Sequence, residues 1–467
     1  MSIKATIELE ETRLLWSQTT KCQTKLINGG DKPLLQINPE NRKSSATISL
    51  TNVKTGETVF HAETLVPDAN RSVKSLETGE TLEDKFDLAT RFQFPACGIF
   101  DLRARYEWLD GNIESAALRL EVLPANPQSL FTATRSKSKI GDVFSAWVNK
   151  DSDGFSIWLT LINIAAEPRF VWAKKIETIS DMVTPYLSVP TNTNPQRQYL
   201  AWISGNKLNY VIFEEGHPQA SFVELDADDY VIIPPLLEDF YIGAIKQPAE
   251  ILLLKKNSDE WQIQVVMLGK SPTFSNELKV RGAAPEWFQT IYRSNGDRYT
   301  FVLMPQSREG NPYTKLAMSL WKAQVPPSKP IFLHNLQGSL IAADVFLSTD
   351  DRIFGAALVK QESAFVIQKW QLDKNDELKL IELPPLSWNE EWAIEHAILR
   401  VNGEGIPFML LKGGPKGKWF WMDDSGEIVL LEEFSSKINL PADIVFVGNT
   451  FPTILYTDET CGLRFYG

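Results

Sequence analysis

Between residues 139 and 467 the chain repeats one pattern of hydrophobic and polar positions, in which two apolar strands flank a tight polar turn. Successive turns are about 40 to 55 residues apart, a length typical of structural repeats that each form one small sheet. The pattern therefore predicts seven repeated β units. The seven turns are Ser152-Asp153-Gly154, Gly205-Asn206, Gln247-Pro248, Ser294-Asn295-Gly296, Thr349-Asp350, Asn402-Gly403 and Gly448-Asn449.

The strands within a repeat differ in composition. Strands predicted to be first have small residues in their middles, as expected where blades converge on an axis; these residues are Ala146, Ala201, Gly243 and Ala342. Strands predicted to be second are almost continuously apolar, as in residues 251–254, 300–304 and 407–411, which indicates burial on both faces. Aromatic residues mark the strands predicted to be third: Trp172, Phe222, Trp261, Trp321, Trp370, Trp419, Trp421 and Phe465.

These features predict a β-propeller over residues 128–467, with seven blades favoured and six or eight as alternatives. In the stretches 370–378 and 421–430 an aromatic residue precedes an Asp-rich turn. This arrangement resembles the blades of the WD-repeat-like propeller superfamily, although the Gly-His and Trp-Asp dipeptides of WD repeats are missing. The chain ends at residues 462–467 without room for a fourth strand, and residues 129–134 precede the first complete repeat. Pairing between them is expected to close the propeller with strands from both ends of the domain.

Residues 1–124 show short strands with alternating polarity, separated by turns such as 28–31 and 110–112. This spacing favours a β-sandwich. The stretch 94–106 has the arrangement Pro-x-x-Gly-x-aromatic-x-Leu-x-Ala-x-Tyr, and it resembles the penultimate strand of bacterial immunoglobulin-like modules. Two prolines, Pro124 and Pro127, then end the last strand and stiffen the connection to the second domain. The predicted fold is all-β, an immunoglobulin-like β-sandwich followed by a propeller.

Net charge restricts the kinds of partner that the chain could bind, and apolar content and cysteines indicate where it is located. The net charge of −12 and the lack of clustered Lys and Arg argue against nucleic acid as a partner. We expect no membrane insertion, because no stretch approaches the ~20 apolar residues of a membrane span, and no secretory signal is recognised. Three cysteines without metal spacing, Cys22, Cys97 and Cys461, suggest a cytoplasmic protein; a Cys22–Cys97 disulfide is the alternative.

Motifs for chemistry are scarce. The four histidines are far apart and show no zinc-binding spacing, and no Gly-x-Ser-x-Gly nucleophile elbow occurs. Asp151-Ser152-Asp153-Gly154 is interpreted as a hairpin turn rather than a calcium loop, because no far-end Glu follows. We therefore predict no metal and no cofactor. His396 lies on a predicted inner strand. Paired carboxylates from different blades would leave no local pattern, so chemistry by channel-facing acids stays open.

Aromatic residues near the entries to predicted inner strands are the candidate binding residues: Trp287, Phe288, Trp388 and Trp392. Exposed Trp is favoured at interface hot spots, whereas the alternative is that these side chains pack between blades. The sequence favours a non-enzymatic interaction or scaffold protein whose propeller face binds a protein or peptide, as a single chain or as a subunit of a larger assembly. The alternative is a propeller enzyme acting on a carbohydrate-like polar substrate.

Overall fold

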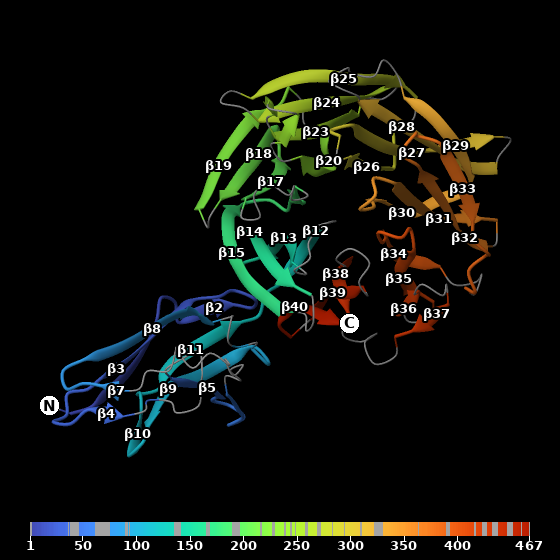
Figure 1. The fold of residues 1–467 in the computed structure, drawn as a ribbon. Helices are drawn as coiled ribbons and strands as arrows, with labels where there is room; N and C mark the ends of the chain where they lie inside the picture. The colour runs from blue at the N-terminus through green and yellow to red at the C-terminus, as the bar shows by residue number, and fades with distance from the viewer. Residues whose placement is uncertain are drawn as a thin grey trace. The chain divides into compact units, whose positions relative to one another are not determined.

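The computed structural model describes most of the chain as β-strands and turns (Figure 1). The described residues are 2–35, 37, 46–60, 75–88, 92, 94–134, 142–164, 169–188, 197–214, 217–226, 229–237, 240–242, 245–247, 249–256, 260–268, 272–282, 284–293, 295–308, 311–321, 330–362, 364–388, 393–414, 417–422, 427–431, 438–445, 452–458 and 460–466. Within these ranges no helix is long and apolar enough to cross a membrane. The chain divides into two compact units. The first comprises Met1–Asn126, Arg169–Lys174 and Asp458–Leu463, and the second Pro127–Pro168, Lys175–Thr457 and Arg464–Gly467.

The first unit contains two main sheets and a short two-stranded one. Its strands are β1 (Lys4–Leu9), β2 (Arg13–Leu15), β3 (Lys21–Ile27), β4 (Leu34–Leu35), β5 (Thr47–Asn52), β6 (Thr58–Phe60), β7 (Ser75–Leu76), β8 (Thr81–Asp87), β9 (Gly98–Trp108), β10 (Gly111–Glu114) and β11 (Leu118–Leu123). The strand orders are β1-β3-β8, β2-β11-β9-β5-β6 with β10 beside β9, and β4-β7.

Alternating burial produces the core of this unit. In β9 every second side chain from Phe100 to Tyr106 is buried, as a strand with one face in a core requires. Strand β1 of the first sheet contacts β9 of the second. The three cysteines form no disulfide, so the Cys22–Cys97 pairing is absent. The Cys97 amide instead donates a hydrogen bond to Cys461 Sγ at 3.2 Å, within the same unit.

The second unit, together with residues 169–174 and 458–463, forms a succession of antiparallel sheets, numbered here in chain order. Sheet 1 has β12 (Pro127–Thr134), β13 (Asp142–Lys150), β14 (Phe155–Asn163) and β15 (Arg169–Ile179). Sheet 2 has β16 (Tyr186–Leu187), β17 (Arg197–Ser204), β18 (Lys207–Glu214) and β19 (His217–Glu224). Sheet 3 has β20 (Tyr230–Leu237), β23 (Ala249–Lys256), β24 (Glu260–Leu268) and β25 (Thr273–Arg281), and β21 (Phe240–Ile242) with β22 (Ile245–Gln247) forms a separate hairpin.

The remaining sheets follow the same order of strands. Sheet 4 has β26 (Trp287–Tyr292), β27 (Arg298–Arg308), β28 (Asn311–Trp321) and β29 (Ile331–Gln337). Sheet 5 has β30 (Ser339–Leu347), β31 (Ile353–Gln361), β32 (Ala364–Leu372) and β33 (Leu378–Glu382). Sheet 6 has β34 (Ile394–Val401), β35 (Pro407–Gly413), β36 (Lys418–Met422) and β37 (Ile428–Leu430), and sheet 7 has β38 (Asn439–Val445), β39 (Thr453–Asp458) and β40 (Gly462–Tyr466).

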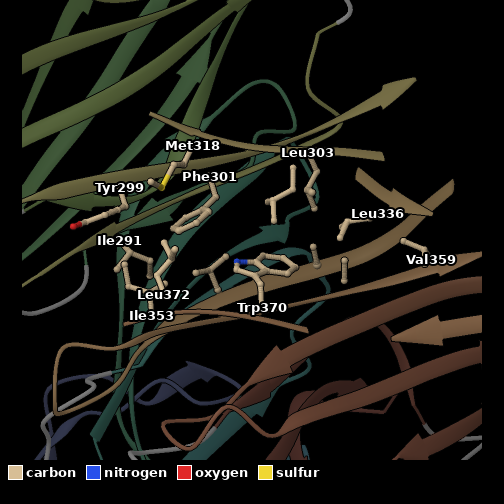
Figure 2. Close-up of a cluster of buried hydrophobic side chains, with 14 of the residues drawn as sticks. Ile291, Tyr299, Phe301, Leu303, Met318, Leu336, Ile353, Val359, Trp370 and Leu372 are labelled. Carbon is tan, nitrogen blue, oxygen red and sulfur yellow. The ribbon is translucent and has the colours of Figure 1, made fainter. Parts of the chain in front are cut away.

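Apolar clusters join neighbouring sheets. The cluster in Figure 2 combines Tyr299 and Phe301 of sheet 4 with Trp370 and Leu372 of sheet 5. Similar clusters join sheets 2 and 3, 3 and 4, 5 and 6, and 6 and 7. Second strands such as β31 are buried along almost their whole length, because each is covered on both faces. This confirms the assignment of the apolar runs at 251–254, 300–304 and 407–411 to second strands.

The first strands of successive sheets contact one another in cyclic order. Contacts run from β12 to β16, then to β20, β26, β30, β34 and β38, and from β38 back to β12. In Figure 1 the sheets follow one another in the same sequence. The fold of the second unit is therefore all-β, built from repeated antiparallel sheets, and compatible with a propeller.

The structure corrects the predicted closure by paired strands. Residues 129–134 belong to β12, which pairs along its length with β13 of its own sheet. In the part of the chain that is described, sheet 7 has three strands and β12 is not one of them. The physical reason is that β13 is a second strand, buried on both faces, and it needs an inner partner of its own.

Several strands also occupy different positions from those predicted. The segments containing Ala146 and Ala201 are second strands, β13 and β17, and not first strands. Trp172 and Phe222 lie on fourth strands, β15 and β19, and not on third strands. Small residues suit second strands equally well, because neighbouring sheets approach both faces there; both alanines are fully buried.

Candidate functional site

Three charged side chains on first strands meet inside the second unit. Arg400 of β34 lies between two carboxylates: its Nη2 is 2.7 Å from Asp443 Oδ1 of β38, and its Nη1 is 4.0 Å from Asp344 Oδ1 of β30. Thr132 Oγ1 of β12 donates a hydrogen bond to Asp443 Oδ2. We call Thr132, Asp344, Arg400 and Asp443 the inner polar cluster. Its members come from sheets 1, 5, 6 and 7.

Burial determines the electrostatics of this cluster. The side chains of Asp344 and Asp443 are 9% and 4% exposed. Burial raises the pKa of Asp344 to about 6, against the opposing attraction of Arg400 and the hydrogen bond from the Val401 amide. Burial also acts to lower the pKa of Arg400, but the charges of Asp443 and Asp344 outweigh it and hold that pKa above its ordinary value. Arg400 therefore remains a cation between the two acids.

The protein's own donors occupy most of the carboxylate oxygens. Asp443 Oδ1 accepts hydrogen bonds from Arg400 and from the Ile444 amide at 2.8 Å, while its Oδ2 accepts from Thr132. Asp344 Oδ2 accepts from the Val401 amide at 2.8 Å. A catalytic carboxylate pair needs oxygens directed at a substrate, whereas these oxygens are directed at neighbouring strands. The arrangement holds first strands together.

Other buried ion pairs connect sheets further along the succession. Arg298 of β27 pairs with Glu250 of β23, with both side chains below one-tenth exposed. Arg293, directly after β26, is 2.8 Å from Asp376 in the turn between β32 and β33, and Tyr299 donates to the same carboxylate at 2.7 Å. Among the described residues no group of three or more His, Cys, Asp or Glu could hold a metal ion.

The structure places the sequence-predicted aromatic residues in different environments. Trp287 of β26 is partly buried against the core of sheets 4 and 5, and Phe288 is partly buried against the core of sheets 3 and 4. Trp388 is 8% exposed and packs edge-on against Phe420 at 4.8 Å between ring centroids. Trp392 lies outside the described residues. Trp287 and Phe288, which are adjacent on β26, thus pack against two different cores. A binding face shared by the four aromatic residues stays a prediction.

His396 lies on β34, a first strand, and packs against an aromatic side chain. Its ring is edge-on to Trp419 at 6.4 Å between centroids. Burial, with a smaller contribution from Lys412, lowers its pKa, so the imidazole is neutral at pH 7. This environment is that of a packed side chain.

Sequence reasoning missed the inner polar cluster, although a signal existed. Asp344 interrupts the apolar stretch 340–346, and Asp443 lies between Ala442 and Ile444. A lone carboxylate inside a buried strand needs a partner. The sequence could indicate that partners exist, but Arg400 is 56 residues from the first acid and 43 from the second, and local pattern does not bring them together.

A second feature found only in the structure is an apolar outer surface. Exposed large apolar residues gather on the fourth strands of several sheets: Phe222 on β19, Phe274 on β25, Ile331 and Phe332 on β29, Leu380 and Ile381 on β33, and Val429 on β37. A pocket of about 640 Å³ lies beside Phe332, between residues of sheets 3 and 4. Apolar side chains repeated along outer strands suit contact with another molecule.

Comparisons with known proteins give no family. No family model matches the chain, and no curated protein matches it. Among solved structures the chain is similar to a eukaryotic initiation factor at 11% identity, covering 90% of this chain and 95% of that one, with a TM-score of 0.32. It is similar to a post-proline cleaving enzyme from Rickettsia typhi at 12% identity, covering 70% and 48%, with a TM-score of 0.29.

A further similarity is to an acylaminoacyl peptidase from Pyrococcus horikoshii at 9% identity, covering 97% of this chain and 57% of that one, with a TM-score of 0.33. Similarities at this level carry no argument about function. The functional conclusion therefore depends on the residues of this chain alone.

Proposed function

We propose that the second unit is a seven-bladed β-propeller and that the first unit is an immunoglobulin-like β-sandwich. The cyclic contacts among first strands support the propeller, together with the apolar clusters between successive sheets. Closure would then depend on side chains rather than on a shared strand, because Thr132 of sheet 1 bonds to Asp443 of sheet 7. The two main sheets of the first unit, with β1 in contact with β9, support the sandwich.

On this scaffold we propose a non-enzymatic interaction protein, which binds a protein or peptide partner and acts alone or as a subunit of a larger assembly. The observation that carries this proposal is the set of exposed apolar side chains on the fourth strands, of which Phe222 is 56% and Val429 is 52% exposed. Burying such residues against a partner stabilises a complex. The first unit would act as a spacer or a second docking surface.

A cytoplasmic location belongs to the same proposal. Cys22, Cys97 and Cys461 are thiols and not disulfides in this structure, although the Cys97 amide is only 3.2 Å from Cys461 Sγ. Close cysteines that stay as thiols suit a reducing compartment. Mass measurement after alkylation of freshly purified protein, without added reductant, would count the thiols.

The test is recovery of a partner with the full chain from its native host, followed by reconstitution from purified components. We expect a complex that survives purification and that weakens on substitution of outer apolar residues, as in the double variant Phe332→Ser, Phe222→Ser. Met182→Ser in the second unit, where Met182 is 46% exposed and lies outside the fourth strands, is the matched control. Trp287→Ala tests the aromatic face predicted from the sequence. If no reconstituted complex forms with any recovered protein, the interaction proposal fails.

A propeller enzyme is the second candidate, because two buried carboxylates, Asp344 and Asp443, lie on either side of Arg400. A pair of carboxylates is what glycoside chemistry uses. Against it, both oxygens of Asp443 already accept hydrogen bonds from the protein. Hydrolysis of chromogenic aryl glycosides that disappears in Asp443→Asn, with the fold retained, would favour this candidate over the binding role.

A further inference from the structure

The pocket beside Phe332 combines a largely apolar lining with a single charge. Its lining includes Val280 of β25, residues 304–307 of β27, Lys315 of β28 and Phe332 of β29, and the polar side chains among them are Gln306 and Ser307. Its volume of about 640 Å³ is in the range of sites that hold several side chains or a small ligand. We call it the outer groove.

Two of the fourth strands contain no Lys, Arg, Asp or Glu: β29, which borders the outer groove, and the three-residue β37. Strand β29 is the longer, with seven residues, and its Ile331 and Phe332 are 45% and 50% exposed. By contrast, β15, β25 and β33 all carry charged residues of both signs. Charges along an edge strand prevent pairing with another chain. Strand β29 is the outermost described strand of sheet 4, and it lacks this protection.

Lys315 defines the charge that the outer groove prefers. It is the only charged residue among the described lining residues, and its Nζ lies 5.1 Å from the centroid of the Phe332 ring. None of the described acidic side chains forms an ion pair with it, in a chain whose net charge is −12. A half-buried ammonium group beside an aromatic ring and two prolines, Pro305 and Pro330, suits a carboxylate flanked by an apolar group.

We propose that the outer groove and the outer edge of β29 bind an extended peptide segment of the partner protein, with an Asp or Glu side chain on Lys315 and a neighbouring apolar side chain in the groove. The inference rests on the proposed interaction function and names its site. Backbone pairing with β29 supplies affinity, and the groove supplies specificity, as in other cases of strand addition to a sheet edge.

A second copy of this chain is a poorer occupant than an acidic peptide. Antiparallel pairing of two β29 strands would bring two Lys315 side chains to the same interface, and β29 itself offers no carboxylate to pair with them. Like charges brought together at an interface oppose association. The charge in the groove therefore selects a different, acidic partner.

The test uses the full chain and a library of random linear 12-residue peptides displayed on phage, followed by synthesis of the enriched peptides. We expect Asp or Glu next to an aromatic or branched apolar residue in the enriched sequences. In fluorescence anisotropy, Lys315→Glu should weaken these peptides by about tenfold or more, since a lost charge pair in a partly dry groove is worth about one decade in affinity. Lys315→Arg should retain binding to within about threefold.

Two controls separate the site from a folding defect and from general charge. Lys379→Glu on β33, an outer strand of the next sheet, should leave the affinity unchanged, and thermal melting should show that all variants fold. In strand addition, alternate backbone amides of the peptide point toward the sheet and away from it. N-methylation of the set that pairs with β29 should therefore abolish binding, and N-methylation of the other set should be tolerated. An equal loss of affinity on methylation of either set of amides would contradict backbone pairing.

The inference is overturned if no peptide binds, if enriched peptides lack acidic residues, if Lys315→Glu binds them unchanged, or if the chain dimerises through β29. Its failure differs from failure of the interaction proposal. A reconstituted partner complex that is insensitive to Lys315→Glu would remove the outer groove and leave the interaction function standing. Absence of any reconstituted partner would remove the interaction function itself.

Discussion

Among the described glycines, Gly355 on β31 has the least room for an added Cβ atom. It pairs across the sheet with Trp370 of β32, whose buried indole lies over it. A Cβ atom added at Gly355 would be 2.1 Å from Trp370 Cε2, far inside contact distance, so the indole would have to move. The glycine thus permits the third-strand tryptophan to pack in the core between sheets 4 and 5 (Figure 2).

We predict that Gly355→Ala lowers the free energy of unfolding by about 1–3 kcal/mol, the usual cost of overpacking a core. Equilibrium urea unfolding, monitored by tryptophan fluorescence and circular dichroism, measures it. The matched control is the double variant Gly355→Ala, Trp370→Phe, in which the smaller ring relieves the clash. The decrease in its free energy of unfolding should be smaller than the sum of the decreases in the two single variants. A change below about 0.5 kcal/mol in Gly355→Ala would contradict the packing argument.

A pH-dependent prediction concerns Asp344. Its pKa in the folded chain is about 6, compared with an ordinary value near 4. Between pH 4 and 6 the folded chain therefore retains a proton that the unfolded chain has released, and stability falls as pH rises through this window. Well above pH 6, where Asp344 is ionised in both states, the loss of folding stability due to Asp344 levels off at about 3 kcal/mol. This value follows from a pKa difference of about two units at ~1.4 kcal/mol per unit.

Asp344→Asn removes that titration. Relative to the original chain, the free energy of unfolding of this variant should rise by about 3 kcal/mol between pH 4 and pH 7, as measured by urea unfolding at each pH. Asp350→Asn is the control, because hydrogen bonding to Ser348 and pairing with Arg352 lower the pKa of that exposed carboxyl. Because a lowered pKa titrates below about pH 4, the free energy of unfolding of Asp350→Asn relative to the original chain should change little between pH 4 and pH 7. Identical pH profiles for the original chain and Asp344→Asn would disprove the assignment.

Individual functional residues were the least predictable part of the molecule. The sequence indicated a role for aromatics such as Trp388, but its indole is buried in a core, and apolar composition alone does not distinguish a core residue from a binding residue. The inner polar cluster was not predicted, because its members meet only through contacts between sheets. The uncharged stretch of β29 was visible in the sequence, but its exposure was not.

At the scale of elements, the type of each strand was more predictable than its place in a sheet. Continuous apolar runs correctly marked second strands such as β23 and β35, because burial on both faces excludes polar residues. Tight turns were a poorer guide. The turn at Gly205 joins a second strand to a third, whereas the turn at Asn402 joins a first to a second. Turn chemistry depends on backbone angles and not on strand position.

The misplaced strands explain the error in closure. Treating β13 as a first strand left residues 129–134 without a partner in their own sheet, and a distant partner then had to be supposed. The burial pattern of β13, with seven consecutive buried residues, resembles that of β31. Aligning the repeats by their apolar runs, and not by their turns, would place β13 in the same position as β31, as a second strand.

At the scale of the whole molecule, the proposed propeller closes only if its first and last sheets are held in contact. Sheet 7 and sheet 1 share no strand among the described residues, so the contact between β12 and β38 depends on side chains. Asp443 is central to it, because it accepts from Thr132 of sheet 1 and pairs with Arg400 of sheet 6. Removing Asp443 takes away the nearer of the two carboxylates beside Arg400 and the acceptor for Thr132, and the loss of one partner of a largely buried ion pair is destabilising.

We predict that Asp443→Ala opens the second unit at this joint before the rest unfolds. Hydrogen exchange measured by mass spectrometry should become faster by about tenfold or more in peptides covering β12 and β38–β39, since the opening is local, with little change in β27 and β28. Asp226→Ala is the control, because Asp226 pairs with Lys255 on an exposed surface, and it should leave β38 protected. A uniform increase across all sheets would mean that Asp443 stabilises the unit as a whole, and the joint between sheets 7 and 1 would not be its weakest point.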